Sequence, residues 1–167
     1  CTGNAVVPVG SITLPATSIR YHDRIFVTGA TETGKSHLAR ALFLAAATPR
    51  TVIDPADSDL TRVPGARTFR DPRSRVLLEA PTSRFVPTDS GDLDAYDELY
   101  RRMFNAGPRY VWVDEAGIVF PQSNRANPRR NFLVQGRKRE LGHLALHTRP
   151  RECDVNLIRS EEHTSEL

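Results

Sequence analysis

The residues with the clearest chemical pattern lie between Gly29 and Ser36, in the segment GATETGKS. Their spacing matches the phosphate-binding loop G-x-x-x-x-G-K-[ST]. Gly29 and Gly34 permit backbone conformations that turn successive N–H groups toward a phosphate. Lys35 is one of only two lysines beside 21 arginines, and its flexible charge follows β- and γ-phosphates better than the planar fork of an arginine would.

This loop predicts that the chain binds ATP together with Mg²⁺, for which Ser36 supplies a hydroxyl ligand. The helix that begins at the loop directs the positive end of its dipole at the anion. The predicted nucleotide-binding residues are Gly29, Ala30, Thr31, Glu32, Thr33, Gly34, Lys35, Ser36 and His37.

A second pattern, YVWVDE, places two acids after a predicted apolar strand. Following a phosphate-binding loop by about 80 residues, it matches the Walker B pattern. Asp114 is then predicted to hold Mg²⁺ with Ser36, and Glu115 to orient and deprotonate the attacking water. ATP hydrolysis is therefore a prediction that rests on the residues themselves.

A third strand end, LALHTRP, offers a polar group that could sense the γ-phosphate. The sequence leaves open whether that group is His147 or Thr148, and His147 is equally well explained as a structural histidine at a strand end. Arg137 and Arg139 are candidates for an arginine finger that reaches a neighbouring subunit, or they lie on a solvated helix face. The predicted catalytic residues are Lys35, Glu115, Thr148 and Arg137.

The candidate site residues must be positioned by strands and helices, and the hydrophobic pattern of the sequence predicts both. Predicted strands cover 25–27, 51–54, 83–87, 109–114 and 143–150, and residues 1–20 contain a possible edge strand or lead-in segment. A predicted helix runs from Lys35 with Leu38, Leu42 and Ala45 near one face, and another is capped by Asp89 or Ser90 and stopped by Gly107. Residues 55–75 and 120–130 are predicted loops, and 130–140 a helix. Strands that alternate with helices predict an α/β fold with a mainly parallel sheet.

Composition indicates one globular domain in a reducing cytoplasm. The chain has 167 residues, 39% apolar and 26% charged, with a net charge of +3. Its two cysteines form no recognisable metal or disulfide framework. No apolar run approaches membrane-spanning length. A basic cluster of Arg129, Arg130, Arg137, Lys138 and Arg139 could contact nucleic-acid phosphates.

The last nine residues, RSEEHTSEL, resemble the translation of a common sequencing-library adapter. We therefore expect the native P-loop ATPase domain to cover 1–158, incomplete at both ends, and 159–167 to be read-through. Because that segment holds one arginine and three glutamates, removing it changes the net charge from +3 to +5.

The segments VIDP, VWVDEAG and QGRKRELGHLALHTRP together resemble the FtsK/HerA-type P-loop ATPases, over roughly residues 20–158. The resemblance implies a RecA-like core with an added strand between the P-loop and Walker B strands. It also implies a ring-shaped homo-oligomer that moves or packages double-stranded DNA in a bacterial, archaeal or phage-infected cell. Two residues depart from the family pattern: Thr148 replaces the usual glutamine, and Glu32 places an acid in the loop, which requires that its side chain point away from the phosphates.

Two other functions remain open at this stage. One is a phage assembly or secretion ATPase like the zonula occludens toxin-type proteins, with the same fold but no DNA substrate. The other is a nucleotide-gated binding module without turnover, against which Glu115 argues, since a module that only binds ATP needs no general base.

Overall fold

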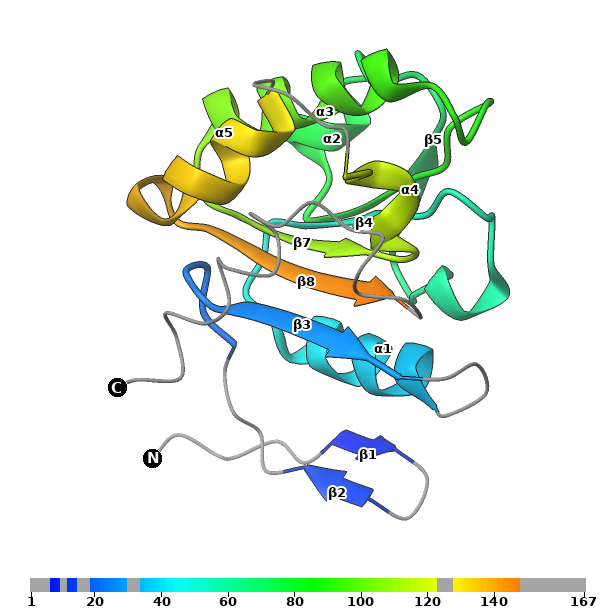
Figure 1. Ribbon diagram of the computed structural model, residues 1–167. Coiled ribbons are helices and arrows are strands. Elements are labelled where there is room, and N and C mark those ends of the chain that lie inside the picture. The colour runs from blue at the N-terminus through cyan, green and yellow to red at the C-terminus, as the bar shows by residue number, and fades with distance from the viewer. Residues whose placement is uncertain (1–6, 10–11, 15–18, 30–33, 123–127, 148–167) are drawn as a thin grey trace.

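The protein is built on a six-stranded sheet in which every pairing is parallel (Figure 1). The computed structural model describes residues 7–9, 12–14, 19–29, 34–122 and 128–147. The strands of the sheet are β3 (Arg24–Thr28), β4 (Arg50–Ile53), β5 (Arg67–Phe69), β6 (Thr82–Phe85), β7 (Arg109–Val113) and β8 (Leu141–His147). Their order across the sheet is β3-β8-β7-β4-β6-β5.

The last strand, β8, lies between the strand that precedes the phosphate-binding loop, β3, and the strand that precedes the two acids, β7. Thr28 pairs with His147, and Val113 pairs with Ala145. Because the strands are parallel, their carboxyl ends meet at one edge of the sheet, where ligands bind in α/β folds. The added strand implied by the sequence resemblance is therefore confirmed, and it is β8.

Helices cover both faces of the sheet (Figure 1). On one face α1 packs through Phe43, whose ring centroid lies 5.6 Å from that of Trp112. On the other face Val111 and Val113 join the cluster formed with α3 and α5. Alternate residues of β7 thus point to opposite faces, and all of them are buried, as expected for a central parallel strand. The helices are α1 (Lys35–Ala45), α2 (Val76–Glu79), α3 (Leu93–Ala106), α4 (Ala116–Val119) and α5 (Pro128–Gln135), with 3-10 turns η1 (Asp59–Thr61) and η2 (Gly136–Arg139).

The structure corrects several expectations about these elements. Residues 55–75 are not wholly irregular, because they contain η1 and the edge strand β5. In α1 the buried positions are Ala39, Ala41 and Phe43, whereas Leu38 is exposed. The cap of α3 is Asp92, whose carboxylate accepts the Ala95 N–H at 3.0 Å, and not Asp89 or Ser90.

The segment before β8 also differs from the expectation. The helix α5 begins at Pro128, within the predicted loop, and gives way to the 3-10 turn η2 at Gly136. Proline is common at a first helical position, because its missing N–H has no partner there in any case. The predicted lead-in segment contributes β1 (Val7–Val9) and β2 (Ile12–Leu14), a separate antiparallel pair. In the part of the chain that the structure describes, no helix is long and apolar enough to cross a membrane.

Candidate active site

Three strand ends bring the predicted functional groups to one edge of the sheet. Gly29 follows β3, the acids Asp114 and Glu115 follow β7, and His147 ends β8. The helix α1 begins at the same edge with Lys35 (Figure 1). Residues that are up to 118 positions apart in sequence, Gly29 and His147, therefore meet because the sheet is parallel and β8 lies between β3 and β7.

Both glycines of the phosphate-binding loop have positive φ angles, 155° at Gly29 and 81° at Gly34. Side chains disfavour these conformations, which explains why the pattern needs glycine at the two positions. Lys35 and Ser36 are half-buried in the first turn of α1, and His37 is exposed. Ala30, Thr31, Glu32 and Thr33 lie outside the described residues, as does Thr148.

The Asp114 side chain is nearly buried, in a residue only 8% exposed. Burial raises its pKa to about 6, and the neighbouring carboxylates of Asp54 and Glu115 add to this effect, while Lys35 opposes it. The described residues make no hydrogen bond to this carboxylate. The site thus gathers more negative than positive charge around Asp114, an arrangement that a cation would stabilise.

Glu115 has a left-handed backbone conformation, with φ 56° and ψ 64°, immediately before α4. Residues other than glycine rarely adopt it, and such outliers gather at functional sites. Its side chain is 41% exposed, and Oε2 lies 3.4 Å from Nδ1 of His147. A carboxylate is therefore available to solvent beside the more deeply buried Asp114.

A further carboxylate at this edge, Asp54, was not predicted as a functional residue. It follows β4 and is fully buried, and it accepts hydrogen bonds from the Thr61 hydroxyl and from Nη2 of Arg84 at 2.6 Å. Arg84 lies on β6 and also pairs with Asp57 at 2.7 Å. The signal in the sequence was an arginine, Arg84, inside a predicted strand, because such a residue needs an acidic partner when it is buried.

The basic cluster is not a single surface. Arg129 is only 2% exposed, its Nε donates to Asp97 at 2.7 Å, and its Nη1 donates to the Val119 carbonyl. The prediction that Arg129 contributes to a nucleic-acid-binding patch is therefore wrong, because its guanidinium is buried and paired with Asp97. Arg139 lies over the Phe104 ring, 4.4 Å from the centroid, and donates to the Phe104 carbonyl.

The predicted finger, Arg137, is exposed in η2, which precedes β8. This turn therefore lies at the amino edge of the sheet, opposite the carboxyl edge where Lys35 and Asp114 lie. Seven residues of β8 separate the two edges by about 20 Å. Arg137 is thus remote from the site of its own chain.

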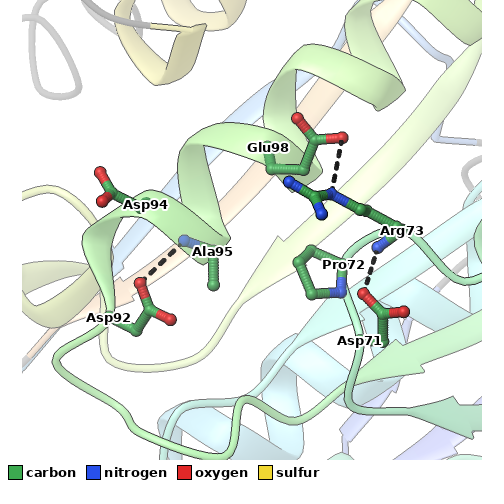
Figure 2. Close-up of a pocket in the computed structure, with 7 residues that line it drawn as sticks. All are labelled: Asp71, Pro72, Arg73, Asp92, Asp94, Ala95 and Glu98. Carbon is green, nitrogen blue, oxygen red and sulfur yellow. Dashed lines mark hydrogen bonds and ion pairs between the residues drawn. The ribbon is translucent and has the colours of Figure 1, made fainter.

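Figure 2 shows a separate cavity of about 290 Å³ near the start of α3. Three of its four acids have contacts within the chain: Asp92 caps the helix, Asp71 accepts the Arg73 N–H at 2.8 Å, and Glu98 faces the Arg73 side chain at 3.9 Å. The cavity is lined by Asp71, Pro72, Arg73, Asp92, Asp94, Ala95 and Glu98, none of them a predicted site residue.

Comparison with known proteins gives likenesses only among solved structures. No protein-family model matches the sequence. No curated protein matches it either. The genome-packaging NTPase B204 from Sulfolobus turreted icosahedral virus 2, in complex with ATP-gammaS, superposes with a TM-score of 0.65 at 14% identity, over 83% of this chain and 70% of that chain. Its sulfate complex gives 0.66 at 15% identity over the same shares.

The DNA-packaging ATPase B204 from Sulfolobus turreted icosahedral virus gives a TM-score of 0.61 at 13% identity, over 83% of this chain and 72% of that chain. Together with the sheet order and the flanking helices, these likenesses define the class of fold. The chain has the α/β fold of a P-loop NTPase, with a RecA-like parallel sheet flanked by helices. The fold class predicted from the sequence is confirmed.

Proposed function

We propose that this protein binds ATP with Mg²⁺ at the carboxyl edge of the sheet and hydrolyses it. The observation that carries the proposal is the convergence of Lys35, Asp114 and Glu115 on that edge, at the beginning of α1 and the end of β7. A P-loop lysine and a pair of adjacent acids are the groups that phosphoryl transfer to water requires.

The loop and the first turn of α1 form the nucleotide-binding part of this proposal. Backbone N–H groups between Gly29 and His37 surround the phosphates, and Lys35 neutralises charge on the β- and γ-phosphates. The left-handed φ angles of Gly29 and Gly34 support this role, because they turn the backbone as the pattern requires.

The residues present also fit a magnesium ion. Burial, together with the neighbouring acids Asp54 and Glu115, raises the pKa of the Asp114 carboxyl to about 6, so a divalent cation would favour its ionised form. Asp114 and the Ser36 hydroxyl are hard oxygen ligands, which Mg²⁺ prefers, usually with water and substrate phosphates completing the shell. When bound, the ion would neutralise the charge that develops on the phosphate oxygens.

Glu115 is the general base of the proposed reaction. Its carboxylate takes a proton from a water molecule while the water oxygen forms a bond to the γ-phosphorus. The bond between the γ-phosphorus and the β,γ-bridging oxygen breaks, and its electron pair leaves on ADP. The products are ADP and inorganic phosphate, and Lys35 stabilises the charge on the departing and transferred groups.

We further propose that ATP hydrolysis drives the movement or packaging of double-stranded DNA by a ring of identical subunits. The likeness to viral packaging NTPases supports this step, as does the sequence resemblance. Arg137 is the proposed finger for a neighbouring subunit, since it is exposed at the far edge of its own sheet, whereas Arg139 is engaged by Phe104. Thr148 keeps its proposed role as sensor of the γ-phosphate.

Replacement of Lys35 by alanine tests the ATP site. We expect Lys35→Ala to lose ATP binding or turnover in the full-length protein, measured by calorimetry and by phosphate release. Arg67→Ala is a matched loss of one cation on β5, at the opposite side of the sheet, and should keep both properties. Turnover at the parental rate in Lys35→Ala would contradict the P-loop assignment.

Assembly and DNA stimulation test the motor. The ATPase rate per subunit should rise with protein concentration and with double-stranded DNA, and salt should weaken the DNA effect. Mixing inactive Arg137→Ala subunits with Lys35→Ala subunits should restore activity, because some interfaces then combine an intact loop with an intact arginine. A trans arginine contributes on the order of 10³-fold or more in well-studied systems. Concentration-independent turnover, with no DNA response and no rescue, would leave a P-loop ATPase that is not a ring motor.

A further inference from the structure

The end of β8 is in contact with the base proposed for ATP hydrolysis. His147 is the last residue of the strand and only 6% exposed, and its Nδ1 lies 3.4 Å from Oε2 of Glu115. The two residues come from neighbouring parallel strands, β8 and the end of β7, so the sheet itself sets their separation. The partly exposed carboxylate thus has a nearly buried imidazole on one side.

A glycine on the adjacent helix makes room for that imidazole. A Cβ added to Gly117 in α4 would lie 2.5 Å from Cε1 and 2.6 Å from Nε2 of His147. Contacts this short do not occur, so either the ring or the helix would have to move. Gly117 lies within a short α-helix and outside the left-handed φ region, so its backbone conformation is one that any residue can adopt. Glycine is required here for space and not for backbone freedom.

The backbone of Glu115 restricts the other partner. Its left-handed conformation, φ 56° and ψ 64°, is one that a glutamate adopts rarely. The Ile118 N–H donates to the Glu115 carbonyl at 3.0 Å, which ties this conformation to α4. The same short helix therefore fixes the backbone of Glu115 and, through Gly117, the position of His147.

We propose that His147 is a positioning residue, which holds the Glu115 carboxylate where it can accept a proton from water, and that Gly117 is glycine to admit the imidazole. This inference rests on the proposed ATPase function. Nδ1 of His147 and Oε2 of Glu115 are in proximity at 3.4 Å without a formed hydrogen bond. In the proposed active geometry, Nδ1 donates its N–H to one carboxylate oxygen of Glu115 and leaves the other oxygen for water. A base that is misplaced by about 1 Å loses on the order of 10²-fold in rate, so a residue that restrains it affects kcat and not substrate binding.

Steady-state ATP hydrolysis by the full-length protein tests the proposal with matched variants. His147→Leu and Gly117→Ala should each lower kcat on the order of 10-fold and leave KM for ATP within about twofold. His147→Asn should recover most of the activity, because its amide N–H can occupy the place of Nδ1. Gly91→Ala is the control, since its Cβ would meet only ordinary contact with Asp89 at 3.4 Å, and it should be unchanged.

A double-mutant cycle separates the space argument from general damage to the helix. In the His147→Ala background, Gly117→Ala should cost little, because no imidazole remains for its methyl group to displace. Additive losses, or an increase of KM with kcat unchanged, would overturn the proposal.

Nuclear magnetic resonance without nucleotide measures the contact directly. The ring resonances of His147 should shift in Glu115→Gln and in Gly117→Ala, but not in Gly91→Ala, and unshifted resonances would overturn the proposed contact. An active parent with an inactive Glu115→Gln and fully active His147 variants would overturn the inference alone. A parent without ATPase activity would overturn the proposed function, and with it the positioning role.

Discussion

Two carboxylates, Asp54 and Asp114, follow neighbouring parallel strands at the same edge of the sheet, and both are buried. Asp54 is enclosed by the protein: the Thr61 hydroxyl and the Arg84 guanidinium donate to it. Asp114 receives no hydrogen bond from the described residues, and burial beside other acids raises its pKa to about 6.

The comparison teaches that position at a strand end does not decide the role of an acid. At the end of β4, Arg84 on β6 pairs with the Asp54 carboxylate and compensates its charge. We call Asp54, Thr61 and Arg84 the closed cluster. Among the described residues, the flanking strands β4 and β8 place no such cation at the end of β7, and Lys35 on α1 lowers the pKa of Asp114 against the effect of the acids. The proposed site for a cation and phosphates therefore lies at the strand end where the described residues leave the carboxylates less compensated.

The largest expected effect comes from breaking the closed cluster. Arg84→Met leaves the Asp54 charge buried, so we expect the free energy of unfolding to fall by about 3–5 kcal/mol in urea denaturation. Arg70→Met is the matched control, because Arg70 pairs with Asp57 at 3.3 Å on an exposed surface, where solvent screens the pair, and it should change the stability far less. The double variant Arg84→Met/Asp54→Leu should regain part of the loss. Equal stability of the two single variants would contradict the closed-cluster interpretation.

A buried histidine away from both strand ends gives the next largest loss of stability. His143 on β8 is fully buried near the rings of Tyr100, Phe120 and Phe132, and burial, with a smaller effect of Arg24, lowers its pKa to about 3. Between pH 6.5 and 3 the unfolded chain therefore takes up a proton that the folded chain does not. Stability is lost as pH falls, by about 1.4 kcal/mol per pH unit.

From pH 6.5 to 4.5 the parent should lose about 2 kcal/mol more than His143→Gln, which cannot take up that proton. Glutamine retains a polar group for the Tyr100 hydroxyl, which lies 3.3 Å from Nε2. The same substitution at the more exposed His22 is the control for the loss of a histidine as such. Parallel pH profiles of the parent and His143→Gln would show that the folded state binds this proton after all.

A change of the opposite sign is expected at Asp114. The pKa of Asp114 is about 6 in the folded chain, against 3.8 as the ordinary value, so the unfolded chain ionises first and the folded state loses stability as the pH rises from about 4 to about 6. At about 1.4 kcal/mol per pKa unit, Asp114→Asn should therefore raise the free energy of unfolding of the nucleotide-free protein by about 3 kcal/mol at pH 7.5, and the gain should vanish below about pH 4. Asp54→Asn should be destabilising at both pH values, because it leaves Arg84 undercompensated. If Asp114→Asn and Asp54→Asn destabilised the protein to the same extent, the proposed difference between the ends of β7 and β4 would be contradicted.

Sequence reasoning predicted the residues of the candidate site because their signals are local. The spacing of Gly29, Gly34 and Lys35 and the acids after an apolar strand are patterns within short windows, and parallel topology then brings them together. The resemblance to a family also predicted the added strand, β8, which periodicity alone could not place. Thr148 and the loop residues 30–33 stay predictions, since they lie outside the described residues.

The features that sequence reasoning missed depend on contacts between distant residues. Arg84 and Asp54 are 30 residues apart, and Arg129 and Asp97 are 32 apart, so no local pattern identifies the acidic partner of either arginine. The edge strand β5 has only three residues, two of them exposed, which gives no apolar run to detect. The cap of α3 is Asp92 and not the predicted Asp89, which accepts the Gly91 N–H instead. Several acids in this short segment could cap the helix, and the backbone conformation determines which of them does.

The central claim is that the two acids after β7, Asp114 and Glu115, take part in ATP hydrolysis. The substitution Glu115→Gln tests this claim most directly. In the full-length protein, we expect ATP and Mg²⁺ to bind with parental affinity while kcat falls by a factor on the order of 10² or more, the scale of a lost general base. Binding by calorimetry and turnover by phosphate release, on the same preparation, measure both quantities. Weakened binding with an unchanged kcat would contradict the account, because Glu115 would then contact the nucleotide without taking part in the chemistry.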